Sequence, residues 1–152
     1  MKFKLTSAVL ASTLFVGCAS VPMETPEADE RAKQFNPPAN DNAGLYIYRA
    51  AGVGTALKKD IRVNGKCIGE SAPLIYFYEE VPGDATHVVS TESEFSPNTL
   101  EVTTKAGENY FIQQYIKMGV FVGGADLQLV APEKGKAAIM ELNLAKKGTC
   151  SS

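Results

Sequence analysis

The sequence is poor in the residues that metal sites and nucleic-acid-binding surfaces need. Its 152 residues include one histidine and no tryptophan, and 15 lysines and arginines stand against 17 aspartates and glutamates. A single imidazole excludes a metal site that takes two or more histidines from one chain. A net charge of −2 also lacks the basic excess of a nucleic-acid-binding domain. We therefore expect no metal, no cofactor and no nucleic-acid partner.

Long hydrophobic runs are lacking as well. The uncharged run Leu5–Val16 has twelve residues. As a helix it would span roughly 18 Å, against about 30 Å for the hydrocarbon core of a bilayer. Lys2 and Lys4 precede this run, and small residues follow it. This order is typical of a signal peptide and not of a membrane span.

The run ends in Leu14-Phe15-Val16-Gly17-Cys18, a segment that resembles a bacterial lipobox. The resemblance implies cleavage before Cys18, attachment of diacylglycerol to its thiol, and acylation of the new amino terminus, for example with palmitate. Two or three acyl chains hold a protein on a bilayer far more firmly than one chain does. Because Ala19 rather than an aspartate follows, the resemblance also implies export to the outer membrane, facing the periplasm. We expect a signal peptide over residues 1–17 and the lipid bilayer as the partner of Cys18.

Residues 18–43 are predicted to comprise the lipidated cysteine and a flexible tether. The segment is polar and contains Pro22, Pro26, Pro37 and Pro38, and proline-rich polar segments remain extended. A proline followed by acidic residues also suits the first turn of a helix, which favours a short helix over residues 26–34.

From residue 44 the hydrophobic pattern changes to a period of two, which predicts strands. Asn64-Gly65 lies between two such runs and is a strong hairpin signal, because both residues tolerate positive φ. Short strands separated by Gly, Pro and Asn turns predict a mainly all-β fold, a single antiparallel β-sandwich over residues 44–145. A short C-terminal helix is predicted from Pro132 to Leu142, although Gly135 weakens it, and residues 146–152 are expected to be a tail.

The strand pattern also gives a set of expected strands and core residues. The expected strands cover residues 45–48, 60–63, 66–70, 74–81, 86–92, 100–104, 110–118, 119–122 and 126–131. The expected core residues are Leu45, Ile47, Ile61, Val63, Ile75, Phe77, Val88, Tyr110, Ile112 and Leu129.

The exported chain has three cysteines, so two remain to pair with each other if Cys18 carries lipid. An even remainder in an oxidising compartment predicts a disulfide between Cys67 and Cys150. Such a bond would pin the C-terminal tail to a central strand. The alternative is that Cys150, close to the end of the chain, is a free or intermolecular thiol.

Few residues suggest catalytic chemistry. Asp84, His87 and Ser90 contain the residue types of a hydrolase triad, but in an extended strand His87 and Ser90 point to opposite faces, so we interpret His87 as a strand residue near a turn. Glu92 and Glu94 share one face of a strand. Paired carboxylates can perform glycosidic acid–base chemistry, but charges at a strand edge more often discourage aggregation.

Tyrosines are the most suggestive surface candidates. Tyrosine combines an apolar ring with a polar tip and is enriched at interfaces. Tyr46, Tyr48, Tyr76 and Tyr78 lie in two predicted strands, where they could line one sheet face that binds a glycan, a peptide or a protein. The alternative is that these rings pack within the sheet, which strands favour.

Six segments of the predicted sandwich carry a family resemblance: Gly44–Arg49, Val63–Glu70, Val81–Gly83, Ser93–Asn98, Gly107–Ile112 and Gly119–Gly124. Together they resemble the bacterial domain-of-unknown-function family 2846, whose members are largely small predicted lipoproteins. The Asn64-Gly65 hairpin with Pro82-Gly83 and His87 is also similar, more weakly, to PEGA-type β-sandwich modules of surface proteins. Neither resemblance supplies catalytic residues.

The sequence thus predicts a membrane-anchored periplasmic lipoprotein whose single β-sandwich binds or scaffolds an envelope protein or a glycan. Two alternatives stay open. One is a cell-wall or glycan hydrolase that uses Glu92 or Glu94, which a deep cleft with converging carboxylates would favour. The other is a carrier of a small apolar ligand, which a closed apolar cavity between the sheets would favour.

Overall fold

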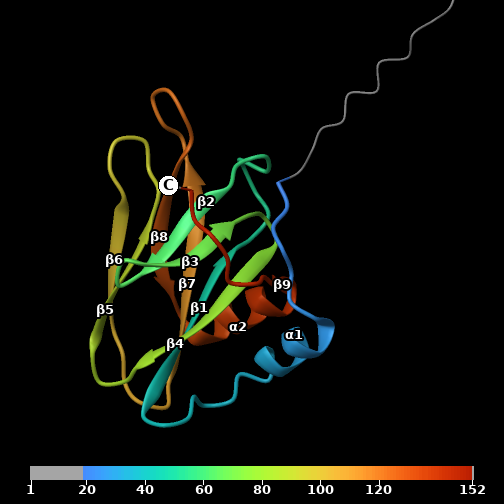
Figure 1. The fold of residues 1–152 in the computed structure, drawn as a ribbon, viewed down its shortest axis with the longest axis vertical. Coiled ribbons are helices and arrows are strands. Elements are labelled where there is room, and N and C mark those ends of the chain that lie inside the picture. Colours follow the sequence, from blue (N-terminus) through green and yellow to red (C-terminus); the bar gives the residue numbers. More distant parts are fainter. Residues whose placement is uncertain (1–18, 152) are drawn as a thin grey trace, which may run out of the picture.

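Nine strands and two helices make up residues 19–151, the part of the chain that the computed structural model describes (Figure 1). The expected signal peptide and Cys18 lie outside these residues. The elements are α1 (Pro26–Ala32), β1 (Asn42–Arg49), β2 (Lys59–Val63), β3 (Lys66–Ser71), β4 (Ile75–Pro82), β5 (Thr86–Thr91), β6 (Asn98–Thr103), β7 (Asn109–Lys117), β8 (Gly124–Val130), α2 (Pro132–Met140) and β9 (Asn143–Leu144). The mainly all-β sandwich with a short C-terminal helix is confirmed.

The strands form two sheets with the orders β8-β7-β1-β4-β9 and β3-β2-β5-β6. Most neighbouring strands are antiparallel, but β1 pairs with β7 in parallel, and β4 pairs with β9 in parallel. The two sheets join along one side of the sandwich. There the Ala125 N–H donates to the Glu92 carbonyl at 3.0 Å, and Asn98 Nδ2 donates to the Ala125 carbonyl at 2.7 Å.

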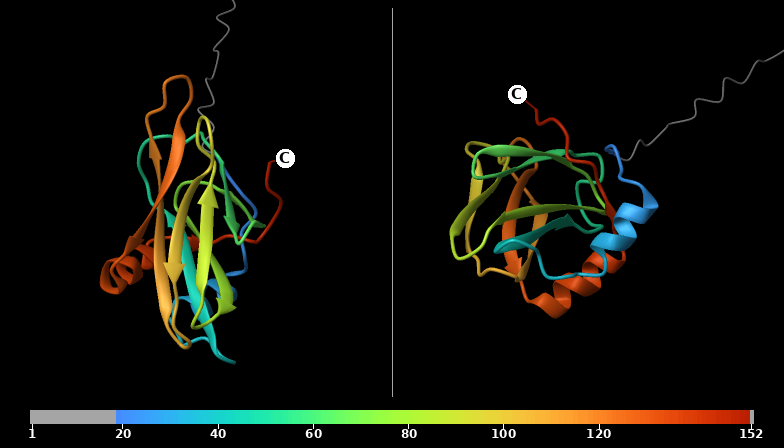
Figure 2. Two further views of the ribbon diagram at one scale, coloured as in Figure 1. Left: turned by 90° about the vertical axis from the view of Figure 1, so that its left-hand side faces the viewer. Right: turned by 60° about the horizontal axis from the view of Figure 1, so that its bottom comes forward.

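Strand β1 is buried on both faces and therefore belongs to two cores. Leu45 and Ile47 pack with the facing sheet in the main core, whereas Tyr46 and Tyr48 lie in a second cluster on the outer face. Both helices contribute residues to this second cluster, and Figure 2 shows α1 and α2 along the outside of the sandwich. The first sheet is therefore a middle layer between the second sheet and the helices.

Two of the expected core residues are exposed. Val88 is 38% exposed because the inward positions of β5 are His87 and Val89, and a shift of one residue reverses the face of a strand. Leu129 is 53% exposed although it shares a strand face with the buried Leu127, because it lies near the end of β8. Tyr110 is half-buried at the edge of the main core.

The Asn64-Gly65 hairpin is formed between β2 and β3, with φ of 51° and 77° at its two loop residues. Positive φ at both positions is the geometry that a two-residue hairpin of this kind needs. The expected strand over residues 119–122 is not formed. These residues instead make up most of the loop between β7 and β8.

Residues 19–41, here called the N-terminal strap, are packed against the sandwich and do not extend away from it. Helix α1 forms at the predicted position, Thr25 caps it, and Pro26 starts it. Met23 pairs with Ala145 in an isolated bridge, and Asn109 Nδ2 donates to the Phe35 carbonyl at 3.0 Å. The expected flexible tether over residues 18–43 is thus folded wherever the structure describes it, because the strap covers aromatic rings on the outer face of the first sheet.

Candidate functional site

The four tyrosines of the expected binding face are covered. Tyr46, Tyr48 and Tyr76 are buried, and Tyr78 is half-buried beside them. The Tyr46 ring lies 4.7 Å from the Tyr78 ring and 5.1 Å from the Phe111 ring, measured between centroids. The structure brings these tyrosines together as the outer core beneath the strap and α2 and not as an open face.

The tyrosine hydroxyls fasten the strap to the sheet. Tyr46 donates to the Ala32 carbonyl at 2.7 Å, and Tyr76 donates to Asp29 Oδ1 at 2.8 Å. Asp29 Oδ1 also accepts the Leu144 N–H at 2.9 Å. Burial, with a smaller contribution from the charge of Glu80, raises the pKa of Tyr46 to about 12. The rings are therefore neutral structural groups at ordinary pH.

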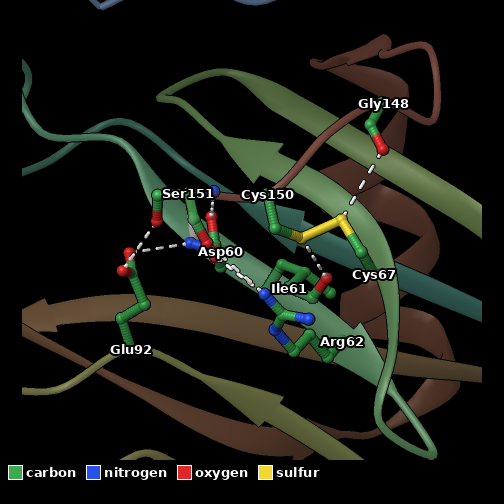
Figure 3. Close-up of a disulfide and its surroundings, with 8 residues drawn as sticks. All are labelled: Asp60, Ile61, Arg62, Cys67, Glu92, Gly148, Cys150 and Ser151. Atoms are coloured by element: carbon green, nitrogen blue, oxygen red, sulfur yellow. Dashed lines mark hydrogen bonds and ion pairs between the residues drawn. A yellow bond between two sulfur atoms is a disulfide. The ribbon is translucent and has the colours of Figure 1, made fainter.

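The C-terminal segment is pinned to the second sheet by the disulfide between Cys67 and Cys150, whose Cα atoms are 5.9 Å apart (Figure 3). The disulfide that the even remainder of cysteines predicts is therefore present in the structure. Cys67 belongs to β3, which is an edge strand and not a central one. Gly148 N–H donates to the Ile68 carbonyl at 2.9 Å, so backbone hydrogen bonding supports the same contact.

Glu92 helps to hold the C-terminal segment against the second sheet (Figure 3). Its Oε2 accepts the Asp60 N–H at 3.0 Å, and its Oε1 accepts the Ser151 hydroxyl at 3.0 Å. Asp60 Oδ1 in turn accepts the Ser151 N–H at 2.9 Å. The carboxylate therefore links β2 to the end of the chain.

Glu94 binds a different segment, the loop between β7 and β8. Its carboxylate accepts the backbone N–H groups of Val120, Phe121 and Val122, the first at 2.7 Å. Desolvation raises the pKa of Glu94, but these three N–H groups outweigh it and hold the pKa below its usual range. The two glutamates weighed for hydrolysis thus bind different segments of this protein and do not converge on one cleft.

His87 is a buried hydrogen-bond junction and not simply a strand residue near a turn. Its Nε2 lies 2.8 Å from the Pro82 carbonyl, which can only accept, so Nε2 carries the proton. Its Nδ1 lies 2.9 Å from Asn64 Nδ2. Because Asn64 Oδ1 accepts the Val88 N–H at 2.9 Å, the Asn64 amide is oriented to donate to the ring. His87 therefore fastens the β2–β3 hairpin to β4 and β5.

Three loops meet at one end of the sandwich, with residues 50–58, 92–97 and 118–123 (Figure 1). We call the exposed apolar residues on these loops the apolar loop end: Val53, Phe95, Met118, Val120, Phe121 and Val122. This cluster is not among the site residues expected from the sequence, because residues 119–122 were expected to form a strand. A sequence signal was available, because an apolar run between glycines shows no alternation.

A pocket of about 520 Å³ lies between the N-terminal strap, the β3–β4 turn and β9. Val21, Leu74 and Leu144 provide part of its apolar lining, and Glu24 and Glu30 are among its polar residues. The alternative of an apolar-ligand carrier placed its cavity between the sheets, but this pocket lies beside the sandwich. Within residues 19–151, no three or more His, Cys, Asp or Glu residues are grouped so that they could hold a metal ion. The described helices include none long and apolar enough to cross a membrane.

The family described as "Protein of unknown function (DUF2846)" matches residues 39–125. The chain belongs to this family. The DUF2846 match starts within the strap and ends at the start of β8, so it includes the hairpin and the apolar loop end but not α2 or Cys150. A protein of Haemophilus influenzae described as "Uncharacterized protein" is 50% identical over 143 residues, which cover 94% of this chain and 84% of that protein. No solved structure matches the chain.

Proposed function

We propose that this protein is a lipid-anchored component of the bacterial cell envelope that acts by binding or scaffolding. The anchor is Cys18, which carries acyl chains after removal of residues 1–17. The Cys67–Cys150 disulfide is the observation that carries this proposal. Disulfides persist in oxidising compartments, which supports export. The bond also uses both of the other cysteines, so Cys18 is the one cysteine outside it.

The proposed location is the outer membrane, with the sandwich facing the periplasm. This part rests on Ala19, which occupies the position where an aspartate would favour retention in the inner membrane. The covered tyrosines argue against a flat aromatic surface for the bound partner, so the partner, an envelope protein or a glycan, would contact other parts of the sandwich.

The engagement of Glu92 and Glu94 supports a role without bond breaking. A general acid or base must reach the atom whose proton it transfers. Here the carboxylate oxygens of Glu92 and Glu94 already accept hydrogen bonds from this chain. Their use as a hydrolytic pair would require both networks to open.

Metabolic labelling tests the anchor. Cells that express the full chain are fed an alkyne analogue of palmitate, and the protein is examined by gel fluorescence and membrane fractionation. We expect wild-type protein to be labelled and membrane-bound, and Cys18→Ala to be unlabelled and to accumulate as a larger precursor.

The matched control replaces the other two cysteines, Cys67→Ser with Cys150→Ser, and should retain the label. Labelling that survives Cys18→Ala, or a Cys18→Ala protein of the same size as the processed wild type, would refute the proposed anchor.

The pocket beside the strap favours a second candidate function, the carriage of a small apolar ligand. Glu24 and Glu30 would suit a ligand with a hydrogen-bond donor or a positive charge at one end. The test is titration of the full chain with a fluorescent amphiphile that bears an amine. Leu74→Lys should weaken binding, because it replaces apolar lining with a charge of the same sign as the amine. The control Leu129→Lys should not, because Leu129 lies outside the pocket. Equal binding by both variants would exclude this candidate.

A further inference from the structure

We propose that the apolar loop end inserts into the surface of the same bilayer that holds the lipid anchor, so that the sandwich stands end-on on the membrane. This inference rests on the proposed lipidation of Cys18. It names a second, non-covalent membrane contact made by the protein's own side chains.

The side chains of the apolar loop end are strongly exposed. Met118 is 90% exposed, Phe121 83% and Phe95 79%. Large apolar side chains gathered at one place on a surface mark an interaction site. These residues come from two loops that are separate in the chain, so the cluster is a product of the fold and not of one hydrophobic segment.

The described chain begins beside one of the three loops. The Ala19 N–H donates to the Thr55 carbonyl at 3.1 Å, which holds residue 19 on the loop that also carries Val53. Cys18 precedes Ala19 directly, and consecutive Cα atoms are about 3.8 Å apart. An acylated Cys18 therefore brings the bilayer to this end of the sandwich, which Figures 1 and 2 show as the end with the three loops.

The three loops are braced against one another. Arg49, which is buried, donates from Nη1 to the Leu57 carbonyl at 2.7 Å and from Nη2 to the Gly54 carbonyl. Gly54 lies against the side chain of Ile116, and Gly123 lies against that of Leu57. The loop at residues 50–58, which holds Ala19, is thus in contact with the loop that carries Phe121.

Glu94 prepares the loop at residues 118–123 for a dry environment. A backbone N–H that leaves water without a partner costs free energy, and lipid offers no partner. Glu94 binds the N–H groups of Val120, Phe121 and Val122. The backbone at the tip is therefore satisfied by the protein while its side chains point outward.

A bilayer is favoured over a protein as the occupant because the anchor fixes where the bilayer must be, whereas no feature at this end selects a protein. Charge does not assist, since the chain without residues 1–17 has 13 basic against 17 acidic residues, a net charge of −4, and anionic lipids attract basic segments. Insertion would therefore depend on apolar side chains and not on lipid charge.

The chain has no tryptophan, so one introduced tryptophan reports its own surroundings. The full-length lipidated protein is purified as Phe121→Trp and reconstituted into vesicles with lipids brominated on the upper part of their acyl chains. We expect a blue-shifted emission and quenching of at least about twofold, because interfacial side chains reach about 5–10 Å into the boundary of headgroups and acyl chains.

The control reporter is Leu129→Trp. Leu129 is exposed and lies on β8 about 17 Å from Gly124, at roughly 3.4 Å per residue, so it should be neither shifted nor quenched. Phe95→Trp is a second reporter on another loop and should behave like Phe121→Trp, which decides the matter if one variant folds poorly.

The outcomes separate the two proposals. Reporters at residues 95 and 121 that behave like the one at residue 129, in protein that floats with the vesicles, would overturn the insertion and leave the lipid anchor intact. Emission that shifts only when envelope proteins are added would also overturn it, in favour of a protein partner. Protein that carries no acyl chain and does not float would overturn both.

Discussion

At the scale of single residues, buried polar groups decide how the strands are fastened. His87 joins the hairpin loop to the end of β4 through one acceptor and one donor contact, each satisfied by a specific partner. Removing a buried polar side chain leaves both a cavity and unpaired groups, so its cost exceeds that of removing an exposed neighbour.

We predict that His87→Ala lowers the free energy of unfolding by about 2–4 kcal/mol, from the lost packing and the unpaired Asn64 amide and Pro82 carbonyl. Val88→Ala is the matched control on the same strand and should change it by less than about 0.5 kcal/mol. Urea unfolding followed by circular dichroism measures both. Equal effects at the two positions would mean that His87 is not a junction.

The raised pKa of Tyr46 predicts that the folded protein loses stability at alkaline pH. This pKa is about 12 in the folded protein, against an ordinary value of 10.0. A raised pKa means that the folded state keeps its proton longer, so this contribution is complete below pH 10.0 and is lost as the pH rises toward 12. The urea midpoint should fall over that range. Tyr46→Phe should show a shallower fall, and an identical pH profile would contradict this assignment.

At the scale of elements, the two helices depend on close approach to the outer face of the first sheet. Gly135 lies in the middle of α2, where a glycine costs about 1 kcal/mol relative to alanine. A Cβ at this position would overlap the ring of Phe111. The glycine that weakens the helix in isolation is therefore what allows the helix to pack.

We predict that Gly135→Ala destabilises the protein. The gain in helix propensity is about 1 kcal/mol, whereas overpacking against an aromatic ring costs about 1–3 kcal/mol. Lys134→Ala, at the exposed neighbouring position, should be neutral or slightly stabilising. Thermal unfolding measures the difference, and a stabilised Gly135→Ala would show that α2 moves away at no cost.

Asp29 is one of the contacts that hold α1, since it accepts from both Tyr76 and Leu144. We predict that Asp29→Ala exposes the N-terminal strap to proteases while the sandwich stays folded, because hydrogen bonds to a charged group contribute about 1.5–3 kcal/mol. Limited proteolysis with mass analysis locates the cuts. Glu30→Ala, exposed on the same helix, is the control, and equal cleavage of both variants would contradict the role of Asp29.

At the scale of the whole molecule, both ends of the described part of the chain are bound to the sandwich. The strap binds beside β9, and the C-terminal segment binds β2 and β3 through the disulfide and Ser151. A cross-link between positions 83 residues apart restricts the unfolded chain strongly. Both ends of residues 19–151 are therefore parts of the fold.

We predict that replacing Cys67 and Cys150 with serine lowers the free energy of unfolding by about 2–5 kcal/mol. Urea unfolding of the wild type with a reductant should approach that of the double variant. The reductant should have no further effect on the variant. An unchanged midpoint after both treatments would show that the C-terminal contacts hold without the bond.

The sequence alone determined the local features of this protein. Alternation of side chains predicted most strands, Asn64-Gly65 predicted the hairpin, Pro26 predicted the start of α1, and the even remainder of cysteines predicted the disulfide. Each of these depends on neighbours in the chain or on residue chemistry, which a single sequence contains.

Only the tertiary structure determined which segments pack over which. The strap looks extended as a sequence because it has no apolar periodicity of its own, yet it folds over rings supplied by β1, β4 and β7. The same contact turned the expected tyrosine surface into a core. Likewise, residues 119–122 form a loop because Glu94, far away in the chain, binds their N–H groups. Such pairings join residues distant in sequence, so local pattern carries no record of them.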